Sequence, residues 1–195
     1  MDPSPKVKQT ESEDLSNFDD TLQSLFESRD VRDKRLFKIL TSDDDLVTLV
    51  LRGHLVIEEL LFAAIAAHCQ EPDLLQDAHL KFSQLIPLIR SLEKMPLMKE
   101  KDWEILTELN SLRNALAHRI EPGDISARIE RLVNMILGPE GTKFLQHPLH
   151  SKQSLKSALA HLFGRLSVIT VFQSALPELI RYQLQEAAKN RSQKS

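Results

Sequence analysis

The sequence predicts an all-α fold. The 195 residues include only 5 glycines and one tyrosine, whereas leucine, alanine, glutamate and lysine, which favour helices, are plentiful. No segment shows a sustained alternation of apolar and polar residues, and the Asn-Gly and Asp-Gly pairs that close β-hairpins do not occur in the sequence. We therefore expect a helical bundle.

The composition is typical of a soluble globular protein, with 42% apolar and 27% charged residues. A formal net charge of −3 argues against non-specific coating of nucleic acid, although a local basic patch can still bind it. The single cysteine, Cys69, cannot form an internal disulfide, which fits a reducing compartment. The N-terminus lacks the apolar core of a signal peptide, and the longest apolar-rich stretch, Leu46 to Cys69, contains charged residues. We expect a cytoplasmic protein with no membrane span.

Residues 1–14 are polar and contain two prolines, and we expect them to be disordered. A first helical region is expected from Leu15 to Leu40, with an apolar face at Phe18, Leu22, Leu25 and Phe26. The run Thr41 to Asp45 separates it from the next helix. Serine and aspartate cap helix N-termini, and acidic side chains favour the positive end of the helix dipole.

A second helix is expected from Asp44 to Gln70. It is apolar over most of its circumference, which in a soluble protein marks the central helix of a bundle. The helix ends by Glu71-Pro72, because the residue before a proline leaves the helical conformation. A third helix is expected from Asp77 to Glu93, and Pro87 inside it predicts a kink or a restart.

A fourth helix is expected from Lys99 to His118, after a break at Met95-Pro96. A fifth follows from Asp124 to Leu137. The segment Gly138 to Ser151 contains two prolines and a further glycine, which predicts a loop.

A last long helix is expected from Lys152 to Ala187, bent or divided at Pro177. Its apolar stripe predicts a packing surface, either within the bundle or against a second copy; it consists of Leu155, Leu159, Leu162, Phe163, Leu166 and Ile169. Residues 15–187 would form one helical domain, and residues 188–195 a polar tail.

The segment that carries most chemical information ends the fourth expected helix and reads Arg113-Asn114-Ala115-Leu116-Ala117-His118. One face of that helix is apolar, since Ile105, Leu109, Leu112 and Leu116 recur at intervals of 4, 3 and 4 residues. Because successive residues differ by about 100° in direction, other residues of this helix form a second face that points away from the stripe. That face carries polar side chains separated by alanine, namely Asn110, Arg113, Asn114 and His118.

This polar face predicts a composite site or a structural role. Arginine can hold a phosphate, and histidine can transfer a proton near neutral pH. On an ideal helix Arg113 and His118 lie about 140° apart, so one helix does not direct both at a single atom. Two copies packed across a twofold axis would form a cleft with two arginines and two histidines. In the structural alternative, the two side chains pair with free carbonyl groups at the helix C-terminus.

The pattern Arg113-Asn114-x-x-x-His118 matches the R-N-x-x-x-H motif of the HEPN superfamily, which the chain resembles over about residues 44–137. The resemblance implies a compact core of four to five helices that dimerises through the motif helix, with extra N-terminal and C-terminal helices. The segment 78–89, Trp103 and the segment 112–118 are similar to the mannitol-operon-repressor branch.

Many catalytic HEPN proteins are metal-independent ribonucleases of toxin–antitoxin, antiphage or RNA-processing systems. The resemblance implies that Arg113 holds the scissile phosphate, that His118 acts as general base or acid, and that Asn114 orients either of them. It also implies an RNA substrate, no metal or cofactor, a homodimer and, in some systems, an antitoxin partner. One toxin branch has a tyrosine two positions after the histidine, where this chain has Ile120.

Other HEPN-like proteins keep the fold as binding or regulatory modules, so the fold alone does not establish catalysis. The alternative function is a non-catalytic regulatory or protein-interaction module that resembles the mannitol-operon repressor, with a role in transcription regulation. A third alternative is a scaffold or antitoxin-paired protein whose partner binds the same polar face.

Four further residues are expected to support the cleft, and they are Asn110, Glu58, His54 and Arg119. His54 and Glu58 lie one helical turn apart, and a carboxylate that faces the cleft can hold the arginine or tune the imidazole. The alternative is an internal ion pair or a buried hydrogen bond. We expect no metal site, because further ligands near His54 and Glu58 are lacking and the loop residues His147 and His150 read as exposed.

Overall fold

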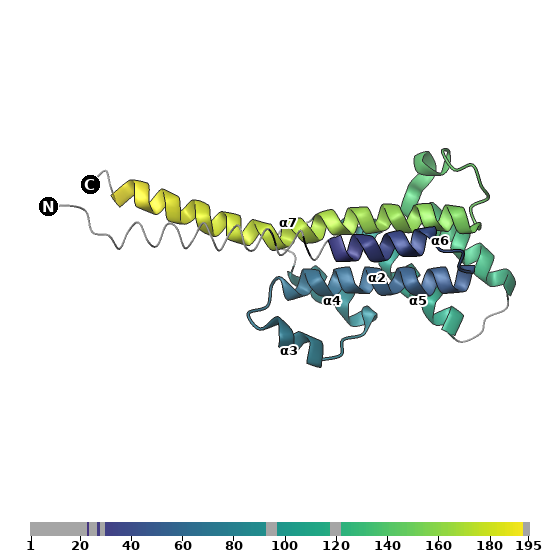
Figure 1. Cartoon of the computed structure of the whole chain (residues 1–195), viewed down its shortest axis with the longest axis horizontal. Helices are drawn as coiled ribbons and strands as arrows, with labels where there is room; N and C mark the ends of the chain where they lie inside the picture. Colours follow the sequence, from purple (N-terminus) through teal and green to yellow (C-terminus); the bar gives the residue numbers. More distant parts are fainter. Residues whose placement is uncertain (1–22, 24–26, 28–29, 93–96, 118–121, 193–195) are drawn as a thin grey trace.

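The computed structural model describes residues 23, 27, 30–92, 97–117 and 122–192 of the chain. Within these residues all regular secondary structure is helical, and the helices pack together into a bundle (Figure 1), which confirms the predicted all-α fold. The predicted disordered N-terminus, the apolar face at residues 18–26 and the break at Met95-Pro96 lie outside the described residues.

A helical segment at residues 30–41 is followed by six helices. They are α2 (Leu46–Ala66), α3 (Pro72–Asp77), α4 (Phe82–Leu92), α5 (Glu100–Ala117), α6 (Pro122–Thr142) and α7 (Lys152–Ser192). The central helix α2 packs against α7, α4 and α5, and α6 packs against α5 and α7. The C-terminal half of α7 projects beyond the ends of α2 and α4 (Figure 1).

The central helix begins at Leu46 and not at Asp44, because Asp45 is its extended N-cap residue. The Asp45 carboxylate accepts a hydrogen bond from the Thr48 backbone N–H at 2.8 Å. The helix ends at Ala66, four residues earlier than predicted. The N–H groups of His68 and Cys69 bond to carbonyls three residues back, in the tight turns that often close a helix.

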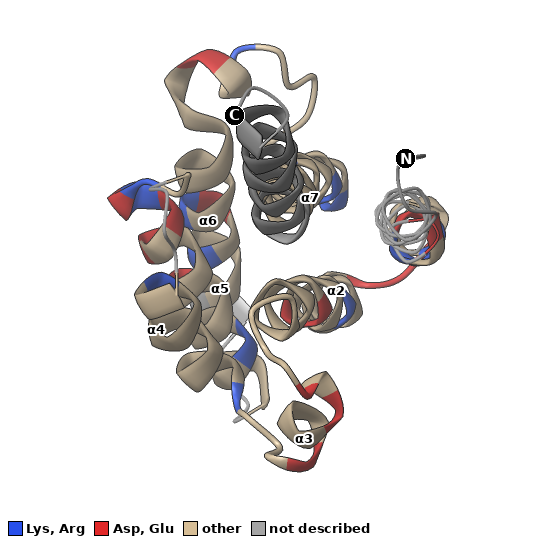
Figure 2. Cartoon of the chain, turned by 90° about the vertical axis from the view of Figure 1, so that its left-hand side faces the viewer, with Lys and Arg blue, Asp and Glu red and all other residues tan. Residues whose placement is uncertain are grey.

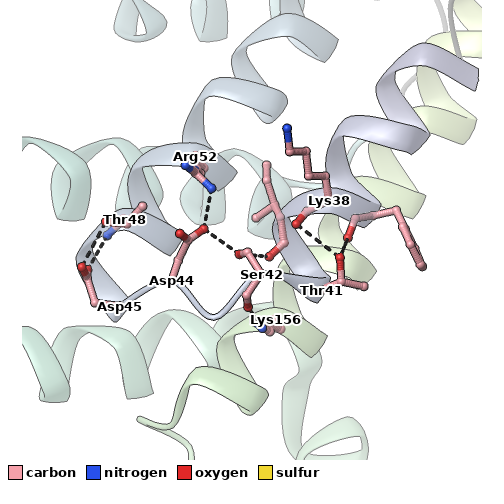
Figure 3. A network of polar contacts seen from close by, with 10 residues as sticks. Lys38, Thr41, Ser42, Asp44, Asp45, Thr48, Arg52 and Lys156 are labelled. Atoms are coloured by element: carbon pink, nitrogen blue, oxygen red, sulfur yellow. Dashed lines mark hydrogen bonds and ion pairs between the residues drawn. The ribbon is translucent and has the colours of Figure 1, made fainter.

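The predicted break after residue 41 is present and joins three elements of the bundle (Figure 3). The Ser42 hydroxyl donates to Asp44 Oδ2 at 2.6 Å, and Arg52 on α2 donates to the same oxygen at 2.7 Å. From α7, the Lys156 ammonium donates to the Ser42 backbone carbonyl. These contacts fix the corner between the segment 30–41 and α2 against the start of α7.

Two predictions in the middle of the chain are wrong. A short helix, α3, occupies residues where the sequence predicted none. Pro72 can begin this helix because the N–H groups of a first helical turn have no partner within the helix, so the N–H that proline lacks is not missed. The helix predicted from Asp77 begins at Phe82 and continues through Pro87 without a restart. Pro87 has no N–H to donate to the backbone carbonyl of Ser83. Ser83 is exposed, so water can bind this carbonyl instead.

The predicted boundaries near the C-terminus also need correction. Gly138 adopts φ 69° and ψ 178°, a conformation open to glycine, and the helix resumes at Pro139 to end at Thr142. The predicted loop therefore begins only after Thr142. The last helix runs to Ser192 instead of Ala187, and it is one element, so Pro177 does not divide it.

The α2 and α7 helices approach closely at Gly53. A Cβ atom at this position would lie 2.8 Å from Leu159 Cδ1, so a glycine allows the α7 leucine to sit against the α2 backbone. Leu159 itself is buried, as are most members of the predicted α7 stripe, which are Leu155, Leu162, Phe163 and Leu166. The first of the two predicted roles of the stripe, packing within the bundle, is therefore the one observed.

One stretch of the described residues, Lys152–Phe172, is long and apolar enough to cross a membrane by length and composition. Its first part is buried among the other helices of the bundle, whereas Val168 and Phe172 near its end are exposed. The packing against α2 and α6 thus accounts for the hydropathy of the buried part, as it does in core helices of bundles.

A pair of glycine substitutions tests the α2–α7 contact. Gly53→Ala should lower the free energy of unfolding by about 1–3 kcal/mol, because the added methyl group displaces the buried Leu159. Gly164→Ala on α7 should raise it by about 0.5–1 kcal/mol, because an added Cβ there meets nothing within 4 Å and alanine favours the helix. Urea denaturation measures both values, and equal effects of the two substitutions would contradict the contact.

Candidate functional site

The motif helix α5 separates an apolar face from a polar one, as the sequence predicts. Ile105, Leu109 and Leu112 are fully buried, and Leu116 is partly buried. On the other face Asn110 is half-buried, whereas Arg113 and Asn114 are exposed. The apolar face therefore anchors α5 in the core and leaves the polar face available to a ligand or a partner.

The exposed pair Arg113 and Asn114 interact directly. Arg113 Nη1 donates a hydrogen bond to Asn114 Oδ1 at 3.1 Å. This contact uses one of the five N–H donors of the guanidinium, which leaves the planar fork able to bind an oxyanion. The arrangement suits a phosphate or a carboxylate that approaches from solvent.

His54 of α2 lies beneath this face and is buried, with 3% of its surface exposed. Its Nε2 lies 3.3 Å from Asn110 Oδ1, and its ring packs on Phe82 of α4 with a centroid distance of 4.2 Å. An amide oxygen only accepts hydrogen bonds, so Nε2 carries the hydrogen in this contact. The buried Nδ1 has no hydrogen-bond partner among the residues that the structure describes.

The surroundings of His54 keep its imidazole neutral. Burial lowers the pKa of His54 to about 4, and the positive charge of Arg113 acts in the same direction, while the hydrogen bond to Asn110 opposes them. A neutral, buried ring that contacts Asn110 is suited to hold the polar face in place. It is not suited to carry a proton at neutral pH.

Glu58 lies one turn after His54 on α2 and is half-buried. Burial raises the pKa of the Glu58 carboxyl and the nearby Glu59 adds to the rise, whereas the charge of Arg113 lowers it. The carboxylate is thus within the electrostatic field of Arg113. The structure brings together four of the predicted residues, two from each helix: His54 and Glu58 from α2, and Asn110 and Arg113 from α5.

Two further predicted residues, His118 and Arg119, lie outside the described residues. The loop residues His147 and His150 are exposed, as expected. In the described parts of the chain, no cluster of three His, Cys, Asp or Glu side chains could hold a metal ion.

No pattern in the sequence connects Phe82 to the site, although its ring covers one face of His54. Phe82 follows His54 by 28 positions in the chain and reads as an ordinary apolar residue of its helix. Only the packing of α2 against α4 brings the two rings together.

Comparison with known proteins gives no match: no protein-family model, curated protein or solved structure matches this chain.

The buried imidazole makes stability depend on pH. The pKa of His54 is lowered from 6.5 to about 4 in the folded protein, so only the unfolded state binds this proton between those values. The contribution of the neutral His54 to the free energy of unfolding is therefore complete above pH 6.5. It decreases by about 2–3 kcal/mol as the pH falls toward 4. The raised pKa of Glu58 opposes this trend over its own titration range. Urea denaturation at several pH values measures the slope.

The substitution His54→Gln should flatten this slope, because glutamine can still donate to Asn110 but does not titrate. His161→Gln is the matched control, since it removes an exposed imidazole on α7 and should keep the wild-type slope. A wild-type slope in His54→Gln would contradict the assignment of the effect to His54.

Proposed function

We propose that this protein is a cytoplasmic, metal-independent endoribonuclease of the HEPN type that acts as a homodimer. The observation that supports the proposal is the joint exposure of Arg113 and Asn114 on the motif helix, with a half-buried carboxylate of α2 beside them. Such enzymes serve toxin–antitoxin, defence or RNA-processing systems, and an antitoxin or another regulatory protein would be the natural partner of this face.

In the proposed reaction, Arg113 binds the scissile phosphate and stabilises the negative charge that develops on it. His118 removes the proton from the ribose 2′-hydroxyl or protonates the leaving 5′ oxygen, and the histidine of the second copy supplies the other step. The 2′ oxygen forms a new bond to phosphorus as the bond to the 5′ oxygen breaks. The products are a 2′,3′-cyclic phosphate and a 5′-hydroxyl.

The remaining polar residues take positioning roles in this proposal. Asn114 orients Arg113 through the hydrogen bond at 3.1 Å. Glu58 supplies a counter-charge that limits the movement of the guanidinium when no phosphate is bound. His54 contacts Asn110, which lies one turn before Asn114. This contact fixes the position of α5 relative to α2.

RNA cleavage in EDTA tests the proposal. The wild type should cleave RNA, and Arg113→Ala and His118→Ala should each reduce the rate by at least about 100-fold, because each removes a group that acts on the reacting phosphate. Arg90→Ala is the matched control, since Arg90 is an exposed arginine on α4 that pairs with Glu100. If the wild type leaves total RNA, transfer RNA and single-stranded RNA intact, the nuclease is wrong and the regulatory alternative is favoured.

A mixing experiment tests the composite character of the site. Arg113→Ala and His118→Ala chains, each inactive alone, should recover part of the wild-type cleavage when mixed, because a mixed dimer retains one arginine and one histidine. Subunit exchange is checked by sedimentation of the mixture. Exchange without any recovery would contradict a site built from two copies.

A further inference from the structure

A hollow of about 290 Å³, here called the α2 hollow, lies between the segment 30–41 and the central helix α2. Figure 2 shows this segment on the side of α2 that faces away from α4 and α5. The floor of the hollow is aliphatic and is formed by Ile39, Leu55 and Val56. Ile39 and Val56 are buried, whereas Leu55 is 54% exposed. The hollow therefore presents an apolar surface to solvent, away from the polar face of α5.

The rim of the α2 hollow carries an excess of positive charge. Three cations line it, Arg35, Lys38 and Arg52, together with the single carboxylate of Glu59. Arg35 pairs with Glu59, and Arg52 pairs with Asp44 of the corner at 2.7 Å. Lys38 is exposed and forms no ion pair with any residue that the structure describes. In Figure 3 the side chains of Lys38 and Arg52 extend on the same side of the corner, so an anion above the hollow can reach both.

The shape of the hollow favours a helix as its occupant. Pockets for small molecules usually have volumes of about 300–1,000 Å³ and enclose most of their ligand, whereas this hollow is smaller and open. Single-stranded nucleic acid stacks its bases on aromatic side chains, and the floor of this hollow is aliphatic. A groove between two neighbouring helices accepts the apolar side chains of a third helix at positions i, i+3 and i+4. The lining residues of α2 extend from Arg52 to Glu59, about 10 Å, which matches two turns of such a helix.

We infer that the α2 hollow is a docking site for an acidic amphipathic helix of a partner protein. A leucine of that helix covers Leu55 and fills the hollow, and carboxylates one turn away on either side meet Lys38 and Arg52. Charge complementarity selects this occupant. A second copy of the chain would bring the same cations against one another, whereas an acidic helix supplies the charge that Lys38 lacks.

The docking site is independent of the proposed nuclease, because none of its lining residues belongs to the polar face of α5. A partner held in the α2 hollow would leave Arg113 and Asn114 uncovered at the point of contact. The site would therefore serve an enzyme or a regulatory module equally, as the place where another protein attaches.

The character of the contact sets its strength. Two helical turns of a partner cover far less than the roughly 800 Å² that each side of a stable interface buries, so an isolated helix binds weakly. We expect a dissociation constant on the order of 10–100 μM for such a helix. The rim cations are exposed, so added salt should weaken the binding.

Fluorescence anisotropy with the full chain and a labelled peptide tests this inference. The probe is a peptide of about 21 residues, three copies of Leu-Glu-Ala-Leu-Glu-Glu-Ala, which is long enough to form a helix. It should bind at least about 10-fold more tightly than the same peptide with lysine in place of glutamate, because the rim is basic.

Two pairs of variants assign the binding to the hollow. Lys38→Glu should weaken the binding of the acidic peptide by at least about 5-fold, because it reverses the charge that has no partner on the rim. Lys101→Glu is its matched control, an exposed lysine on α5. Leu55→Gln should weaken binding by at least about 3-fold, because it removes apolar surface from the floor. Its control is Leu74→Gln on α3, where the leucine is 62% exposed and lies outside the hollow.

Circular dichroism checks that each variant is folded, and Lys38→Ala replaces Lys38→Glu if that variant unfolds. No binding of the acidic peptide up to about 1 mM would overturn the inference, as would equal binding to the wild type and the Lys38 variant. A single-stranded RNA of about 10 nucleotides is measured beside the peptide. If the RNA binds and the Lys38 variant weakens the RNA but not the peptide, the hollow is a nucleic-acid surface and the inference is wrong.

Discussion

The contact of Gly53 on α2 with Leu159 on α7 fixes the rotation of the central helix, and the rest of the arrangement follows from that rotation. Successive residues of a helix differ by about 100° in direction, so three neighbours can face three different surroundings. Gly53 faces the core helix α7, His54 faces α5, and Leu55 faces solvent. A different rotation would bury Leu55 and separate His54 from Asn110.

This rotation also accounts for the electrostatics of the candidate site. It places the imidazole of His54 in an apolar setting, where it stays neutral, and it places Glu58 at the border between the core and Arg113. A half-buried carboxylate beside an exposed arginine limits where the guanidinium can move. In the proposed enzyme, the same border is where a second copy would complete the site, so the stability of α2 packing and the geometry of the site depend on one helix.

The sequence predicted those features that depend on local periodicity and capping. The apolar face of α5 and a cap for α2 within the run 41–45 follow from spacing and side-chain chemistry alone, although the helix begins two residues later than predicted. It did not predict contacts between distant residues, such as that of Gly53 with Leu159 or of His54 with Phe82. Helix ends were also displaced, because tight turns close α2 after Ala66 and the helix resumes at Pro139 after the break at Gly138.

Titration of the His54 imidazole by nuclear magnetic resonance tests the rotation of α2 most directly. If α2 is oriented as described, the ring remains in the neutral form with hydrogen on Nε2 at pH 5.5 and takes up a proton only near its lowered pKa of about 4. A ring that titrates near 6.5, as in a solvated histidine, would show that His54 does not face Asn110 and Phe82. That result would contradict the packing on which the candidate site depends.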